Sequence, residues 1–199
     1  MGNLAFVIKS YTAVTAPTFS LKSPATTGGR LDVIIRSILA AFSSPKGLRK
    51  NIIFYSILAG PPNPPITLEF NGEKMNMIFQ SEEEVAKIIL ESMKGCEIDG
   101  VRAFKADLNE VLRTLSLRNY NIFYLHEEGT PIKCSDIQGD EKKCFVLGDQ
   151  LGLSPSDEKI VSKYMRKKIS LGPLSYLSSF CVITILYIIH ECQRISLIG

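Results

Sequence analysis

Residues 51–59 read NIIFYSILA, an almost unbroken run of residues that favour β-structure. Such a run is typical of a strand that lies inside a sheet and is covered by helices on both faces. Residues 60–65 follow with GPPNPP, whose prolines lack backbone donors and end the strand abruptly. The sequence therefore predicts a central strand that stops at a rigid turn.

The segments on either side of this strand have recognisable patterns. Over Arg30–Phe42 the apolar residues recur at the three- and four-residue spacing of one helix face, and Asp32 favours the helix start. After the turn, Ile66–Phe70 and Lys74–Phe79 are separated by an Asn-Gly pair, which is typical of a β-hairpin. Before the helix lies Ser10–Gly29, a loop of unusual length that we expect to be functional or mobile.

Strands and helices alternate along the rest of the chain, which indicates an α/β fold with a parallel sheet and helices on both faces. The capping residues Ser81, Ser154 and Ser175 mark three helix starts. The expected strands are Asn3–Lys9, Asn121–Leu125, Cys144–Leu147 and Lys168–Leu171, and the expected helices are 81–93, 107–117, 154–165 and 175–193.

The composition is that of a globular protein. The chain has 199 residues, of which 45% are apolar and 22% charged, enough to build one domain or two small ones. The net charge is only +3, but residues 1–80 hold eight basic and three acidic residues, a net charge of +5. A basic N-terminal half suits a polyanionic partner, and a few surface lysines would give the same sum.

The cysteines and the apolar tail bear on the compartment. Five cysteines at scattered positions indicate a reducing compartment and argue against a secreted disulfide scaffold. His126, Cys134 and Cys144 do not have the spacing of zinc ligands, so no metal site is expected.

The N-terminus lacks a signal peptide's apolar stretch. Phe180–Ile189 is about half as long as a membrane-spanning helix, which favours a buried helix or a subunit contact.

Common phosphate-loop, dinucleotide-binding and nucleophile-elbow motifs are absent from the sequence. Three predicted strands instead end in small or turn-forming residues. In open α/β sheets ligands bind beyond the carboxyl ends of strands, and glycine lets the backbone approach a ligand closely. These ends suit an adenine or ribose held by main-chain groups, although loop glycines often only turn the chain. They are Leu125-His126-Glu127, Leu147-Gly148-Asp149 and Leu171-Gly172-Pro173-Leu174-Ser175.

Five segments together resemble the archaeal tRNA pseudouridine N1-methyltransferases, the TrmY family of the SPOUT class. They cover nearly the whole chain in the order of the family and with similar spacing. The segments are Gly29–Val33, Gly60–Pro65, Tyr124–Glu127, Phe145–Gly152 and Ile169–Ser175.

The resemblance implies a single SPOUT-type α/β domain over residues 1–199, with a mostly parallel sheet and a deep trefoil knot in its C-terminal part. It makes residues 1–115 the RNA-facing half and residues 120–199 the knotted half that binds the cofactor and forms a homodimer. The implied activity is methylation of N1 of pseudouridine 54 in the tRNA T-loop by a cytoplasmic, S-adenosylmethionine-dependent enzyme without metal or membrane attachment. The alternatives are a ribosomal-RNA pseudouridine N1-methyltransferase of ribosome biogenesis and a non-catalytic RNA-binding or assembly protein.

The resemblance also assigns the cofactor to a set of residues that follow the three strand ends or lie at the start of the last helix. His126 and Glu127 belong either to the rim of this site or to a solvent-facing turn. The cofactor-binding residues are Leu125, Gly148, Leu171, Gly172, Leu174, Ser175 and Cys181.

The N-terminal half carries the candidates for chemistry and RNA binding. Methylation at N1 requires that nitrogen to lose a proton, and Asp32 is the candidate acceptor. A local ion pair of Asp32 with Arg30 or Arg36 is an equally open interpretation. Arg30 and Arg36 are predicted to bind RNA phosphates, and Lys22, Arg49 and Lys50 are either outer contacts or plain surface.

Overall fold

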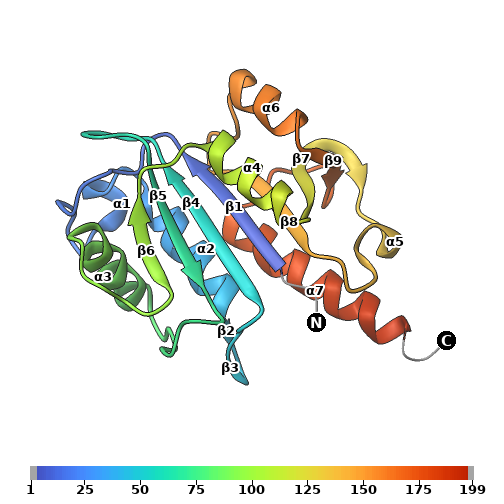
Figure 1. The fold of residues 1–199 in the computed structure, drawn as a ribbon, viewed down its shortest axis with the longest axis horizontal. Coiled ribbons are helices and arrows are strands. Elements are labelled where there is room, and N and C mark those ends of the chain that lie inside the picture. Colours follow the sequence, from blue (N-terminus) through green and yellow to red (C-terminus); the bar gives the residue numbers. More distant parts are fainter. Residues whose placement is uncertain (1–3, 197–199) are drawn as a thin grey trace.

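A computed structural model of the chain describes residues 4–196. Its centre is a seven-stranded sheet in the order β6-β5-β4-β1-β8-β7-β9, accompanied by a small two-stranded sheet of β2 and β3 (Figure 1). The strands are β1 (Leu4–Ser10), β2 (Ser43–Ser44), β3 (Gly47–Leu48), β4 (Ile52–Leu58), β5 (Ile66–Asn71), β6 (Val101–Phe104), β7 (Asn121–Pro131), β8 (Lys143–Gly148) and β9 (Met165–Ser170).

The predicted mostly parallel sheet is confirmed, with an antiparallel edge. The central strand β1 pairs in parallel with β4 and with β8, and β7 pairs in parallel with β8 and β9. Within the seven-stranded sheet, β5 pairs antiparallel with both β4 and β6, and the small sheet of β2 and β3 is also antiparallel. The 51–59 run forms β4, which lies inside the sheet between β1 and β5, as its composition predicts.

Helices cover both faces of the sheet, so alternate side chains of β1 are buried in two different cores. Phe6 and Ile8 face one core with α2, α3, α5 and α7, whereas Ala5 and Val7 face a second core with α4 and α6 (Figure 1). The helices are α1 (Pro24–Thr27), α2 (Leu31–Phe42), α3 (Glu82–Met93), α4 (Leu108–Leu117), α5 (Cys134–Ile137), α6 (Pro155–Ser162) and α7 (Ser178–Ser196).

The predicted hairpin of residues 66–70 and 74–79 is wrong. The first run is β5, but residues 74–79 form no strand, and the antiparallel partners of β5 are β4 and β6. Met75 and Phe79 are buried in the core, where the Phe79 ring packs edge-on against Phe42 and Phe70. The apolar side chains in this segment therefore pack in the core, although the segment itself forms no strand.

The long loop of residues 10–29 is fastened to the proline-rich turn. The Thr15 backbone N–H donates to Pro61 O at 2.8 Å, and the Thr15 hydroxyl donates to Gly60 O at 3.0 Å. Gly60 allows this approach, because a Cβ there would lie 2.4 Å from Thr12 O. The two segments thus form one packed unit at the ends of β1 and β4.

Two expectations for the C-terminal part are corrected. The last helix begins at Ser178, so Ser175 does not cap it and lies in the preceding loop. Cys134 and Cys192 form a disulfide across 58 residues of sequence, a pairing that their scattered positions did not suggest. The disulfide joins α5 to α7. Within residues 4–196, no helix combines the length and apolar character needed to cross a membrane.

Candidate functional site

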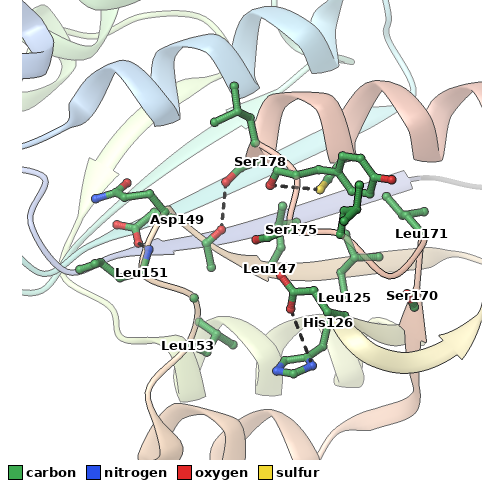
Figure 2. A pocket seen from close by; sticks show the side chains of 18 of the residues that line it. Leu125, His126, Leu147, Asp149, Leu151, Leu153, Ser170, Leu171, Ser175 and Ser178 are labelled. Carbon is green, nitrogen blue, oxygen red and sulfur yellow. Dashed lines mark hydrogen bonds and ion pairs between the residues drawn. The ribbon is translucent and has the colours of Figure 1, made fainter.

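The bulged middle of β7 and the ends of β8 and β9 meet the loop before α7 around a cavity of about 360 Å³ (Figure 2). The expected end of the first strand at Leu125 is thus corrected, because β7 continues past a bulge to Pro131. Parallel strands place their carboxyl ends at one edge of the sheet, which is where ligands bind in open α/β folds. The residues predicted to bind the cofactor are brought together here. The cavity is lined by all of them, namely Leu125, Gly148, Leu171, Gly172, Leu174, Ser175 and Cys181.

The backbone is tightly folded where β8 and β9 end. A Cβ on Gly148 would lie 2.3 Å from the carbonyl carbon of Gly152, so the turn after β8 has no room for a side chain. Gly172 has a φ of +148°, in the region that favours glycine, and its N–H donates to the Ser170 hydroxyl at 3.0 Å. Both turns therefore present main-chain groups at the cavity wall.

The start of α7 closes the cavity. The Ser178 hydroxyl donates to Gly148 O at 3.0 Å, which joins the helix to the end of β8. Cys181 lies one turn further on, and its thiol faces Tyr176 O at 3.9 Å. Burial, helped by the nearby charge of Glu127, raises the pKa of the Cys181 thiol to about 11. The thiol is therefore protonated at neutral pH, which suits packing rather than nucleophilic attack.

His126 and Glu127 line the cavity, and a place for them at the rim of the cofactor site stays a prediction. The Glu127 carboxylate is 3.9 Å from His126 Nδ1. Its own backbone N–H and the Ser175 hydroxyl lower the pKa of Glu127, so the carboxylate is ionised at neutral pH. β7 is bulged between Leu125 and Thr130, and this irregular stretch includes His126 and Glu127.

Asp149 is a cavity residue that the sequence analysis quoted but gave no role. Its Oδ1 accepts the Leu151 N–H at 2.9 Å, in the turn that follows Gly148. Its Oδ2 is buried without a hydrogen-bond partner among the described residues. The sequence signal that could have indicated a role for Asp149 is its position two residues after the end of the predicted strand Cys144–Leu147.

Asp32 lies beside the cavity, whose lining includes the next residue, Val33. Its Oδ1 accepts Arg30 Nε at 3.0 Å, and its Oδ2 accepts Arg36 Nη2. The local ion pairs are thus present with both arginines, and the side chain of Asp32 is only 9% exposed. Whether Asp32 also accepts a proton stays a prediction.

Arg30 has an unusual backbone at the start of α2. Its φ of +66° is left-handed, a conformation that costs a side chain about 1–3 kcal/mol and is found most often at functional sites. Its guanidinium is held by Asp32, whose hydrogen bond and charge raise the pKa of Arg30. The strained backbone therefore fixes where this cation points.

The outer basic residues have different roles. Arg49 Nη1 donates to Ala40 O at 3.1 Å and to Ala41 O at 3.2 Å, so it caps the end of α2. Lys50 Nζ donates to Met75 O. Both are therefore tied to their own chain, whereas Lys22 is exposed. Within residues 4–196, no group of three or more acidic, histidine or cysteine residues is arranged to hold a metal ion.

The chain belongs to the RNA methyltransferase family that its fold and cavity indicate. The family model described as "Putative SAM-dependent RNA methyltransferase" matches residues 4–194. The solved structure of Archaeoglobus fulgidus Nep1 bound to S-adenosylhomocysteine has the same fold, with a TM-score of 0.66 and 14% identity over 98% of this chain and 100% of that one. The SPOUT-type α/β fold implied by the resemblance is confirmed.

The relatives within this family are more specific. The tRNA (pseudouridine(54)-N(1))-methyltransferase of Methanococcus maripaludis strain C5 is 33% identical over 94% of this chain and 98% of its own length. The enzyme of the same name from Thermococcus gammatolerans is 36% identical over 89% of this chain and 92% of its own length. The resemblance to the archaeal tRNA pseudouridine N1-methyltransferases is therefore confirmed.

Proposed function

We propose that this protein transfers the methyl group of S-adenosylmethionine to N1 of pseudouridine 54 in the T-loop of tRNA. The observation that carries the proposal is the cavity between the bulge of β7 and the ends of β8 and β9, which gathers every residue assigned to the cofactor from the sequence. The names of the relatives supply the substrate and the position of the base.

The cavity fits the cofactor. Its volume of about 360 Å³ lies within the range of small-molecule sites. The turn at Gly148 brings backbone against the cavity without a side chain between, which suits recognition of an adenine by main-chain groups. Leu125, Leu171 and Leu174 add apolar walls for its faces.

S-adenosylmethionine supplies a methyl group that is already activated, so the protein has to position the base, exclude water and take up the N1 proton. Pseudouridine has a free N1–H, because its ribose is attached through carbon. Asp32 is our candidate to accept this proton or to hold the base edge. Arg30 and Arg36, both paired with Asp32, hold the RNA backbone through its phosphates.

We further propose that the protein acts as a homodimer whose interface includes α7. Phe180, Ile183 and Tyr187 follow each other on one side of this helix, and each is more than half exposed. Single apolar residues on a surface are common, but a continuous stripe of large ones marks an interaction site. A second copy of the chain would cover this stripe next to the cofactor cavity.

The remaining expectations rest on the resemblance. They are a deep knot in the C-terminal part, an RNA-facing half at residues 1–115, a cofactor-binding and dimer-forming half at residues 120–199, and a place in the cytoplasm with the tRNA. The seven-stranded sheet that unites β1 with β4 and β8 is consistent with both halves acting as one domain.

The test is methyl transfer to two T-loop stem-loops that carry either pseudouridine or uridine at position 54. We expect transfer to the pseudouridine stem-loop alone, because N1 of uridine carries the ribose and has no proton to lose. Equal methylation of both would contradict N1 as the target. Transfer to a ribosomal-RNA hairpin but not to the T-loop would favour the ribosomal alternative, and cofactor binding without any transfer would favour the non-catalytic one.

A further inference from the structure

Within residues 4–196, the lining of the cavity carries carboxylates but no lysine or arginine. Among the described residues that line it, the carboxylate side chains are those of Glu127 and Asp149. The nearest cations lie outside the lining. Lys168 Nζ lies 3.8 Å from the Glu128 carboxylate, and the Arg30 guanidinium is held by Asp32. Their charges reach Glu127 and Asp149 from outside the cavity, so the described lining itself offers a cationic ligand two carboxylates and no lysine or arginine.

Glu127 is the accessible member of this pair. It lies in the bulge of β7, between Leu125 and Thr130, and its side chain is 45% exposed. On one side it meets Ser175 in the loop before α7, and its charge reaches the thiol of Cys181 at the start of that helix. It thus lies in the cavity lining between the bulge of β7 and the start of α7, where a ligand in the cavity would meet it.

Asp149 is the buried member. The residue is 7% exposed, and its Oδ2 has no hydrogen-bond partner among the described residues. A buried carboxylate oxygen without a partner is costly, and a nearby positive charge lowers that cost. The charge of Arg30 reaches Asp149, but Oδ2 accepts no hydrogen bond from it, so a cationic ligand in the cavity would meet an oxygen that is still unpartnered.

Methyl transfer changes the charge of the cofactor. The bond between sulfur and the methyl carbon breaks with its electron pair staying on sulfur, the bond between the methyl carbon and N1 forms, and the N1 proton passes to an acceptor. The sulfonium thereby becomes a neutral thioether, while the rest of the cofactor keeps its structure. S-adenosylmethionine and S-adenosylhomocysteine therefore differ in charge at sulfur, and carboxylates in the cavity lining attract the charged form more strongly.

We propose that Glu127 and Asp149 make the cavity discriminate by charge, so that it holds S-adenosylmethionine in preference to S-adenosylhomocysteine and favours exchange of the product for fresh cofactor. This inference rests on the proposed function for the identity of the cofactor. It assigns Glu127 as a specificity-determining residue and Asp149 as a second, buried source of the same field.

The experiment measures binding rather than activity. Isothermal calorimetry gives the dissociation constants of S-adenosylmethionine, S-adenosylhomocysteine and sinefungin, which carries a protonated amine in place of the sulfonium, for the wild type and Glu127→Gln. We expect the ratio of the S-adenosylhomocysteine to the S-adenosylmethionine dissociation constant to fall about fivefold to tenfold in Glu127→Gln, and sinefungin to weaken with S-adenosylmethionine.

Glu128→Gln is the matched control. It removes the same charge one residue further along, from a side chain that is 82% exposed and lies outside the cavity. Its ratio should equal that of the wild type. Asp149→Asn should shift the ratio in the same direction as Glu127→Gln. If the Asp149→Asn variant does not fold, the ratio measured for Glu127→Gln is the test of the proposal.

Two results would overturn the inference. One is an equal loss of affinity for all three ligands in Glu127→Gln, which would make Glu127 a general contact. The other is an equal shift of the ratio in Glu128→Gln, which would make the effect one of overall charge. In both cases the wild type still binds the cofactor and the proposed function stands. A wild-type protein that binds none of the ligands would contradict the proposed function itself.

Discussion

The hydroxyl of Ser178 donates a hydrogen bond of 3.0 Å to the carbonyl oxygen of Gly148, 30 residues earlier in the chain. This contact joins the first turn of α7 to the end of β8, so the helix and the strand hold the cavity between them (Figure 2). Ser178 is itself buried. The site therefore depends on a contact between segments that are far apart in sequence.

Ser178→Ala should weaken binding of S-adenosylmethionine about fivefold, because one buried hydrogen bond contributes about 1 kcal/mol and its loss leaves Gly148 O without this partner. Calorimetry measures the affinity. Ser162→Ala is the control, since the Ser162 hydroxyl donates to Lys159 O on the exposed side of α6, away from the cavity. An unchanged affinity in Ser178→Ala would show that the contact does not shape the site.

Gly148→Ala should weaken cofactor binding by about tenfold or more, because a Cβ at this position meets the carbonyl carbon of Gly152 at 2.3 Å and the turn has to move. Gly139→Asn is the control. Gly139 has a φ of +85°, which asparagine tolerates, and it has open space around it. Equal affinity of Gly148→Ala and the wild type would remove this turn from the cofactor site.

Much of the fold follows from local pattern. β4 and α2 could be predicted because burial on two faces and burial on one face leave different periodicities in the sequence. The false hairpin at residues 74–79 arose because Met75 and Phe79 are buried without a strand, and apolar spacing alone does not separate the two cases. Besides β4, the strand that pairs with β5 is β6, some thirty residues later, and no local signal indicates this pairing.

The site was predictable where strands end. Gly148 lies at the end of β8 and Leu171 comes directly after β9. Both strands were expected from the sequence, and the topology brings their ends together. The pairing of Cys134 with Cys192 was not predictable, because two cysteines 58 residues apart meet only through the packing of α5 on α7. The free Oδ2 of Asp149 was equally hidden, since hydrogen-bond satisfaction depends on the whole surroundings of a side chain.

Acid should weaken the attachment of α6 to the sheet. Asp157 accepts hydrogen bonds from Lys9 at 2.8 Å and from Tyr11. Burial on its own raises the pKa of Asp157, but these hydrogen bonds outweigh it and hold the pKa below the ordinary value. A carboxyl with a lower pKa in the folded state stabilises the fold above its unfolded pKa of about 3.9, and this contribution is lost as the pH falls further.

Urea unfolding of the wild type and Asp157→Asn measures this contribution. At pH 7 we expect Asp157→Asn to lower the free energy of unfolding by about 2 kcal/mol, since Lys9 then lacks its charged partner. The difference should shrink as the pH falls below about 4. Glu191→Gln, which breaks an exposed ion pair with Arg194, should change the free energy by less than about 0.5 kcal/mol. A pH-independent difference for Asp157→Asn would contradict the role of the charge.

Ile183→Lys should convert a dimer into a monomer, because it places a charge within the exposed apolar stripe of α7. Analytical ultracentrifugation at micromolar concentration measures the mass, and the fold is checked by circular dichroism. Ile185→Lys is the informative contrast. Although Ile185 lies in the same apolar run, it is fully buried in the chain's own core, so this change should unfold the protein. A wild type that sediments as a monomer would contradict the dimer.

Asp32→Asn separates two roles of one carboxylate. If Asp32 accepts the N1 proton, the amide cannot replace it, and turnover at saturating RNA and cofactor should fall about a hundredfold or more. Cofactor affinity should stay within a few-fold of the wild type, because Asp32 lies beside the cavity rather than in its lining.

Arg30→Ala and Arg36→Ala should instead weaken RNA binding, and they should lower its salt dependence because fewer condensed counterions are released. If Asp32 only orients the two arginines that its oxygens hold, Asp32→Asn would behave like the arginine variants, with a raised KM for RNA and a nearly normal kcat at saturation. Steady-state kinetics on a pseudouridine-containing T-loop thus decides between a proton acceptor and a positioning residue, because the first lowers kcat and the second raises KM.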